Sequence, residues 1–227
     1  MLQQTQVERV VPFYKTFIKT FPTPARLASS PLSSVLRAWQ GLGYNRRAKM
    51  LREAARELAS RDIRTVSELE TLPGVGPYTA RAVAAFAWNR NVVFVETNIR
   101  TAIIHHFFPR RRSVADTELV EVLKRVLPKG RSREWHGALM DYGAHLKRSG
   151  VSHNARSEEY AKQPPFLGSF REARGVILRE LSRGERAPAR LTGLLGTARR
   201  AQARRALLNL LAEGLVQKRG RVFSLPR

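Results

Sequence analysis

The two glycines of segment 72–77, Leu-Pro-Gly-Val-Gly-Pro, are the residues best suited to hold a ligand through the backbone. Without a Cβ, Gly74 and Gly76 allow a tight hairpin and leave their N–H groups open to an anion. Pro77 suits the first turn of a helix, and the N-terminus of a helix attracts phosphate. The sequence thus predicts a helix–hairpin–helix that binds phosphate through Leu72, Gly74, Val75 and Gly76.

The charge of the chain indicates where that phosphate comes from. The 227 residues contain 41 Lys and Arg against 18 Asp and Glu, which gives a formal net charge of +23 at pH 7. Such a field attracts polyanions and makes their association fast and dependent on salt. A ribosome-associated protein, or a merely basic surface, is the alternative. We therefore expect DNA or RNA as the partner.

The lack of cysteine excludes several kinds of chemistry. With no cysteine in the sequence, the chain has no disulfide, thiolate zinc site, cysteine nucleophile or cysteine-ligated iron–sulfur cluster. The five histidines show no metal-binding spacing. No apolar run approaches the roughly 20 residues of a membrane span, and no signal peptide precedes the first predicted helix. We expect a cytoplasmic, nucleoid-associated protein without a metal site or a membrane contact.

Helices must position the hairpin, because apolar residues recur with a helical period through most of the chain. Helices are predicted over 7–18, 31–39, 46–60, 78–88, 99–108, 117–126 and 134–147, and a short one capped by Ser67 leads into the hairpin. The apolar face predicted for the first helix consists of Val7, Val11, Tyr14 and Ile18. The inward face predicted for the helix over 46–60 consists of Ala48, Leu51, Ala55 and Leu58.

The last quarter of the chain is predicted to be a separate module. Periodicity is lost from about 149 to 168, which indicates a linker. Three helices, over 170–182, 189–195 and 198–212, and two strand-like runs around Arg219-Gly220 predict a winged-helix-like domain over 169–227. Residues 171–227 hold thirteen Arg and one Lys against four Glu, a net charge of +10. This charge favours contact with the DNA backbone, and docking of a protein partner is the alternative.

Three motifs carry a resemblance to a known family. They are Leu-Pro-Gly-Val-Gly-Pro-Tyr-Thr-Ala at 72–80, Gly-Leu-Gly-Tyr-Asn-Arg-Arg-Ala at 41–48 and Met-Leu-Gln-Gln-Thr-Gln-Val at 1–7. In this order they resemble the helix-hairpin-helix (HhH-GPD) DNA glycosylases, most closely the MutY-type adenine glycosylases and next the thymine/uracil mismatch glycosylases. The resemblance covers residues 1–148 and implies an all-α glycosylase core of two subdomains. The tail does not resemble the oxoguanine-sensing domain of many adenine glycosylases.

The resemblance also implies the catalytic residues. Such enzymes extrude a base and cleave its N-glycosidic bond, with a carboxylate facing the oxocarbenium-like sugar. Glu96 stands at the position of that carboxylate, where the family usually has Asp, and Asn98 at that of an asparagine that orients it. Tyr78 stands where bifunctional relatives carry an attacking lysine, which implies a monofunctional enzyme without a lyase step. Each residue has a structural alternative: Glu96 as an acid at a helix N-terminus, Asn98 as a simple cap residue, and Tyr78 as a core aromatic.

The resemblance places the proton donor outside the 227 residues. In the family this glutamate lies two residues before the Met of Met-Leu-Gln-Gln-Thr, and here that Met is residue 1. We therefore expect this chain to bind DNA with little or no base excision. Either the true start lies upstream, or the protein is a non-catalytic DNA-binding remnant. A glutamate encoded two residues upstream of Met1 would support the upstream start.

Further residues match the family's DNA contacts. Gln4 matches a glutamine wedge that fills the hole left by the extruded base, and Gln3 beside it is a candidate contact to the opposite base. Tyr44 matches one aromatic of a pair that stacks beside the lesion partner, while the second position is Asn45. Arg46 and the cations after it reach phosphates or form an ordinary solvated face.

The cofactor expectation departs from the family. An iron–sulfur loop should follow Met-Asp-Tyr-Gly-Ala at 140–144, but segment 145–153 holds no cysteine, so we expect no cluster. Backbone carbonyls near Glu70, Leu72 and Val75 are candidates to bind a monovalent cation, as in relatives.

The expected function is removal of a mispaired base, adenine opposite guanine or oxoguanine, from double-stranded DNA by a monomer. Removal of thymine or uracil opposite guanine, and DNA binding without catalysis, are the alternatives.

Overall fold

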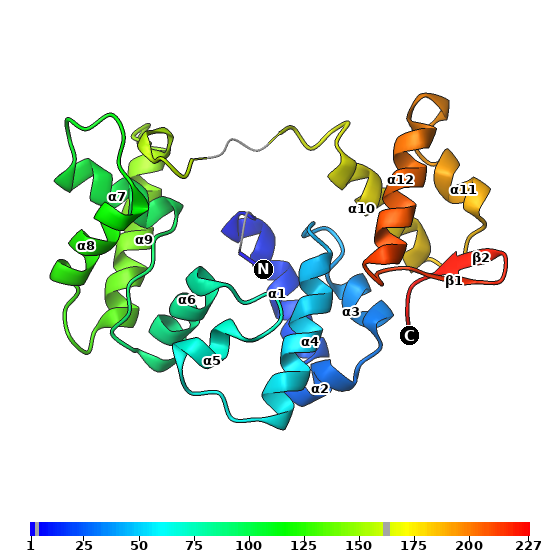
Figure 1. The fold of residues 1–227 in the computed structure, drawn as a ribbon, viewed down its shortest axis with the longest axis horizontal. Coiled ribbons are helices and arrows are strands. Elements are labelled where there is room, and N and C mark those ends of the chain that lie inside the picture. The colour runs from blue at the N-terminus through cyan, green and yellow to red at the C-terminus, as the bar shows by residue number, and fades with distance from the viewer. Residues whose placement is uncertain (3–4, 161–163) are drawn as a thin grey trace. The chain divides into compact units, whose positions relative to one another are not determined.

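The computed structural model describes residues 1–2, 5–160 and 164–227, which fall into two compact units. Unit 1 consists of residues 1–62, 72–74 and 164–227, and unit 2 of residues 63–71 and 75–163. Helices make up most of both units (Figure 1), and the described strands form one two-stranded sheet. The predicted all-α class is confirmed. In the part of the chain that is described, no helix is long and apolar enough to cross a membrane.

Unit 1 combines the first and last helices of the chain around one hydrophobic cluster. The cluster takes Val35 and Trp39 from the N-terminal part and Ile177, Leu207 and Leu210 from the C-terminal part. Its elements are α1 (Val7–Thr20), α2 (Pro24–Ser29), α3 (Leu32–Ala38), α4 (Arg46–Ser60), α10 (Phe170–Ser182), α11 (Pro188–Gly193), η2 (Thr197–Arg199), α12 (Arg200–Ala212), β1 (Gln217–Arg219) and β2 (Val222–Ser224).

The predicted apolar face of α1 does not reach the core. Val7, Val11, Tyr14 and Ile18 are between 42% and 57% exposed, whereas Val10 and Phe17 are buried. The ring of Phe17 lies 4.9 Å from that of Phe21 and 6.0 Å from that of Trp39, so an aromatic stripe forms the core contact instead. The contact of Phe17 with Trp39, a residue outside the helix, therefore decides which face of α1 is buried.

The inward face predicted for the helix over 46–60 is half correct. Its bounds match α4, and Ala48 and Ala55 are buried as expected. Leu51 and Leu58 are exposed, and Ala54 is buried in their place. Helix α2 packs against α4, and small side chains on the buried face allow this close approach.

The C-terminal elements form the predicted helices and hairpin. β1 and β2 pair antiparallel, with Lys218 opposite Phe223, and Arg186 adds a further bridge to Phe223. These elements are tied to the N-terminal helices of unit 1, since Ser33 N donates to Pro226 O at 2.8 Å and Lys49 Nζ to Glu213 O at 2.7 Å. Unit 1 therefore contains both N-terminal and C-terminal segments of the chain. The domain boundaries at 148 and 169 stay a prediction.

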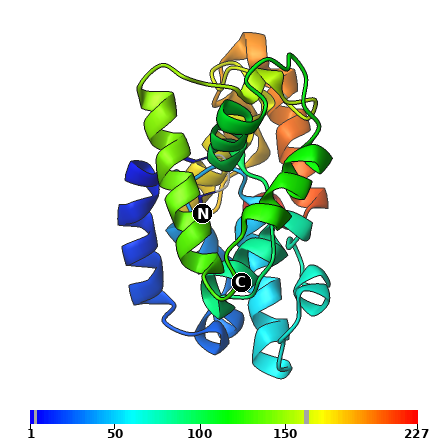
Figure 2. The same cartoon turned by 90° about the vertical axis from the view of Figure 1, so that its left-hand side faces the viewer.

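Unit 2 contains α7 and α8 (Figures 1 and 2), and residues of these two helices form most of the second hydrophobic cluster. Helix α9 packs along α7, and α5 packs against α6. The predicted cap Ser67 is wrong, because Thr65 caps α5 and forms a capping box with Glu68. The elements of this unit are α5 (Val66–Glu70), α6 (Pro77–Trp88), α7 (Thr97–Phe107), α8 (Asp116–Val126), α9 (Ser132–Arg148) and η1 (Asn154–Arg156).

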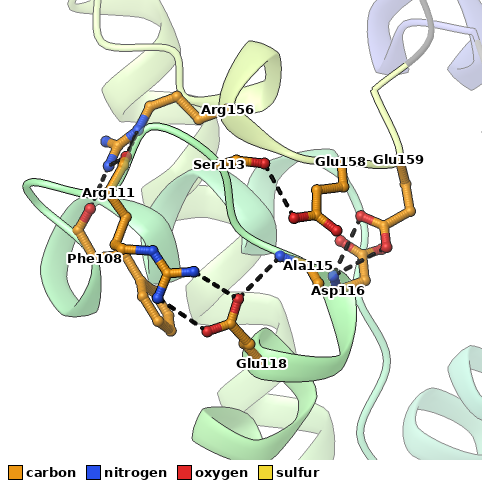
Figure 3. A network of polar contacts seen from close by, with 9 residues as sticks. All are labelled: Phe108, Arg111, Ser113, Ala115, Asp116, Glu118, Arg156, Glu158 and Glu159. Carbon is orange, nitrogen blue, oxygen red and sulfur yellow. Dashed lines mark hydrogen bonds and ion pairs between the residues drawn. The ribbon is translucent and has the colours of Figure 1, made fainter.

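The first half of the predicted linker is anchored to the α7–α8 loop (Figure 3). Arg156 donates to the carbonyl oxygens of Phe108 and Arg111, and Val114 forms a parallel bridge with Ser157. The carboxylates that follow accept further hydrogen bonds in the same place: Glu158 from Ser113 Oγ at 3.1 Å and Glu159 from Asp116 N at 3.1 Å. Residues 156–159 of the predicted linker are therefore held against the α7–α8 loop and the start of α8, and the linker over 149–168 stays a prediction.

Candidate active site

The glycine hairpin joins α5 to α6 as predicted. Gly74 has a φ of +76°, a left-handed conformation that favours glycine. Gly76 is the N-cap residue of α6 with extended backbone, and Pro77 is the first residue of the helix. Both glycines are exposed, whereas the side chain of Leu72 is buried, so Leu72 can meet DNA only through its backbone. The geometry suits a phosphate at the α6 N-terminus.

We predict different effects for alanine at the two glycines. At Gly74 a Cβ would lie 2.8 Å from Met50 Cβ and would be strained at positive φ, so Gly74→Ala should lower both stability, by about 1–2 kcal/mol, and DNA affinity. At Gly76 a Cβ meets nothing within 4 Å, so Gly76→Ala should keep stability and lower affinity alone. Thermal melts and binding to matched and mismatched duplexes measure this. Unchanged affinity of both variants at low salt would refute the phosphate role.

Glu96 is the N-cap residue of α7 and places its carboxylate at the positive end of that helix. Glu96 Oε1 accepts hydrogen bonds from Asn98 N and Ile99 N, each at 2.6 Å. Glu96 Oε2 accepts from the Thr97 hydroxyl at 3.2 Å and can still face another group. The longer side chain that replaces the family's aspartate therefore folds back onto its own helix. The structural alternative, an acid at a helix N-terminus, is shown, and the catalytic role stays a prediction compatible with it.

Tyr78 lies in the first turn of α6 and is 41% exposed. Its ring packs edge-on against Phe94 at 5.6 Å. Burial raises the pKa of the Tyr78 phenol, and the Glu96 carboxylate raises this pKa further. The phenol is thus neutral at physiological pH. A cavity of about 750 Å³ adjoins Tyr78, with walls that include Val93, Phe94 and Lys124.

Asn98 lies in the first turn of α7, against α9. Lys147 Nζ donates to Asn98 Oδ1 at 2.7 Å. One turn earlier on α9, Gly143 is buried against the Asn98 backbone, where an added Cβ would lie 2.0 Å from the carbonyl oxygen. The predicted catalytic residues Tyr78, Glu96 and Asn98 all lie in unit 2, where Glu96 Oε1 accepts from Asn98 N and the Glu96 carboxylate raises the pKa of Tyr78.

Tyr44 lies in unit 1 in the turn before α4, with a φ of +47°. Its ring lies 5.4 Å from the Arg47 guanidinium and 5.5 Å from that of Arg171 on α10. Arg171 Nη1 also donates to the Tyr44 hydroxyl at 2.7 Å. Arg46 is exposed at the start of α4. The predicted wedge residues Gln3 and Gln4 lie outside the described residues.

The loop after α9 does not fit the iron–sulfur cluster of the resembling family. A four-cysteine cluster needs thiolates, and the sequence contains none. The loop instead carries the polar contacts of Figure 3. Among the residues that the structure describes, no group of three or more His, Cys, Asp or Glu side chains is placed to hold a metal ion.

Sequence reasoning missed two side chains of these groups, Lys147 and Arg171. Each meets its partner across a long stretch of chain, 49 residues for Lys147 and Asn98 and 127 residues for Arg171 and Tyr44. In the sequence, both residues are basic positions within predicted helices, at 134–147 and 170–182. No local spacing in the sequence links either pair, so no signal was available to find them.

Comparison with known proteins identifies the family. The model of the HhH-GPD superfamily base excision DNA repair proteins matches residues 1–129. The adenine DNA glycosylase of Mycolicibacterium smegmatis (strain ATCC 700084 / mc(2)155) is 36% identical over 240 residues, which cover 96% of this chain and 82% of that protein. That of Mycobacterium tuberculosis (strain ATCC 25618 / H37Rv) is 35% identical over 255 residues, which cover 100% of this chain and 83% of that protein.

Two solved structures are similar in fold. A thermostable thymine-DNA glycosylase superposes with a TM-score of 0.56 at 26% identity, over 63% of this chain and 69% of that one. A trapped endonuclease III–DNA covalent intermediate gives 0.52 at 20% identity, over 74% and 75%, and supports the fold alone. The family predicted from the three motifs is confirmed. The chain belongs to the HhH-GPD superfamily of base excision DNA repair proteins and, within it, to the adenine DNA glycosylases.

Proposed function

We propose that this protein is a monofunctional DNA glycosylase that removes adenine opposite guanine or 8-oxoguanine from duplex DNA. The observation that carries the proposal is the Glu96 carboxylate, held at the α7 N-terminus by hydrogen bonds from Asn98 N and Ile99 N. Relatives named adenine DNA glycosylase match almost the whole chain, which favours adenine over thymine or uracil.

The chemistry follows from the charges of this group. The target nucleotide leaves the stack, and cleavage of its N-glycosidic bond leaves positive charge on the sugar. The Glu96 carboxylate, fixed by two backbone N–H groups, faces that charge without having to reorganise. Water then adds to the sugar carbon, and the products are free adenine and an abasic site. Tyr78 has no amine, so no Schiff base forms at this position.

Protonation of the leaving adenine is a separate requirement of the reaction. The resemblance assigns it to a glutamate two residues before the position of Met1. Assays should therefore compare the 227-residue chain with a chain extended so that a glutamate occupies that position.

A four-substrate assay tests the proposal. Duplexes with A·G, A·8-oxoguanine, T·G and U·G pairs are incubated with excess protein and then treated with alkali, which breaks the strand at abasic sites. We expect cleavage at adenine by the extended chain, little by the 227-residue chain, and none before alkali. Cleavage at thymine or uracil alone would contradict the adenine assignment. Failure of the extended chain on all four duplexes would contradict the glycosylase function.

The remaining expectations join this proposal. We propose that the protein acts as a monomer in the cytoplasm at the nucleoid, and that the basic residues of 171–227 contact the DNA backbone. Binding should then weaken steeply as salt rises. A monovalent cation at the hairpin carbonyls would make affinity depend on the identity of the cation at constant ionic strength.

A further inference from the structure

Helix α9 holds Asn98 by two contacts one turn apart. Gly143 lets α9 approach the Asn98 backbone, because any side chain there would meet the carbonyl oxygen of Asn98. Lys147, four residues later on the same face of α9, donates from Nζ to Asn98 Oδ1 at 2.7 Å. One contact fixes the backbone of the first α7 turn, and the other fixes the orientation of the side-chain amide.

The hydrogen bond from Lys147 determines which end of the Asn98 amide faces away. An ammonium group can only donate, so Oδ1 must point to Lys147 and the Nδ2 hydrogens must point elsewhere. Asn98 can then offer its Nδ2 donors to a sugar or water oxygen beside Glu96. A hydrogen bond from a charged donor is also stronger than one from a neutral donor.

Lys147 is partly buried at the C-terminal end of α9. Burial lowers the pKa of the Lys147 ammonium, the Glu96 carboxylate raises this pKa, and Arg100 lowers it. Arg100 is itself paired with Asp116 by two hydrogen bonds, at 2.9 and 2.5 Å. The neighbouring Arg148 is exposed. The hydrogen bond to Asn98 Oδ1 therefore directs the Lys147 side chain toward Asn98 and not toward solvent.

We propose that Lys147 is a positioning residue of the glycosylase reaction, which locks the Asn98 amide with its N–H donors toward the reacting sugar. This rests on the proposed function, since it assigns a role within the same site. Lys147 acts through Asn98 and does not itself touch the reacting atoms. The role is supplied by α9, an element whose place in catalysis no motif in the sequence indicates.

The test compares Lys147→Met with Arg148→Met in the extended chain. Both variants remove one positive charge from the same turn, so both should lose the same small amount of affinity for undamaged duplex. Only Lys147→Met should lower the single-turnover excision rate at saturating protein, by about ten- to a hundredfold, because it removes a charged hydrogen bond. Lys147→Arg should recover most of this loss. Combined with Asn98→Ala, Lys147→Met should cause no further loss. Equal rates for the Met variants, or multiplying effects with Asn98→Ala, would overturn the proposal.

A second measurement does not depend on activity. In NMR spectra of the 227-residue chain, the Asn98 side-chain amide should give one ordered pair of Nδ2 proton resonances. Lys147→Met should shift and broaden this pair, while Arg148→Met should leave it unchanged. An unchanged Asn98 amide in Lys147→Met would overturn the proposal even if the parent enzyme is active. If the parent excises no base, the proposed function fails, and the NMR comparison still decides whether Lys147 orients Asn98.

Discussion

Glu96→Gln should lower the adenine excision rate of the extended chain by at least about a hundredfold, with the affinity for undamaged duplex nearly unchanged. The substitution removes the negative charge and keeps the shape of the side chain. The amide oxygen of glutamine can still accept from Asn98 N and Ile99 N, which bind Glu96 Oε1 in the structure. The cap of α7 therefore survives while the charge that faces the sugar is lost.

This substitution separates the two roles of Glu96. Thermal melts of Glu96→Gln should match the parent, whereas Glu96→Ala should lose both the cap and the charge, with a cost of about 1 kcal/mol in stability. Single-turnover rates with excess protein report the chemical step. If Glu96→Gln keeps the parent rate, Glu96 is a structural cap and another group stabilises the sugar.

Gly143→Ala should destabilise unit 2 by about 3 kcal/mol, at the upper end of the usual cost of overpacking. The added Cβ would lie 2.0 Å from the oxygen, 2.5 Å from the carbonyl carbon and 2.9 Å from the Cα of Asn98. All three atoms belong to the backbone, so no side chain can rotate away. Helix α9 would have to move away from α7, and the contact from Lys147 to Asn98 would then be lost.

Gly137→Ala on the same helix is the matched control. A Cβ at Gly137 meets nothing within 4 Å, and alanine is the better helix former by about 1 kcal/mol. Denaturant melts followed by hydrogen exchange of the α7 and α9 amides should show loss in Gly143→Ala and a small gain in Gly137→Ala. Equal stability of the two variants would contradict the close approach of the two helices.

Local sequence patterns predicted the elements well. The helices over 46–60 and 170–182 match α4 and α10 in their bounds, and the glycine hairpin joins two helices as expected. The helical period predicted that α1 is amphipathic but not which of two adjacent apolar stripes is buried. The stripe with Phe17 is buried and the stripe with Val11 is exposed. The reason is tertiary, because the packing partner Trp39 lies outside α1, at the C-terminal end of α3.

The group of candidate catalytic residues was predictable only in part. Glu96 and Asn98 lie two residues apart, so a motif could indicate both. Their support from α9 depends on Gly143 and Lys147, which approach Asn98 only because α7 and α9 pack together. The anchoring of segment 153–159 to the α7–α8 loop is also tertiary, since Arg156 meets carbonyls about 45 residues away. Such pairs have no periodic signature in the sequence.

Binding of a charged sugar mimic tests the central claim most directly. Two duplexes are compared, one with a neutral tetrahydrofuran and one with a cationic pyrrolidine ring in place of the target deoxyribose. Neither needs a proton donor, so the 227-residue chain suffices. The parent should bind the cationic ring at least about tenfold more tightly, as a mimic of the transition state, and Glu96→Gln should lose this preference. Equal affinity of the parent for both rings, or an unchanged preference in Glu96→Gln, would contradict the assignment of Glu96.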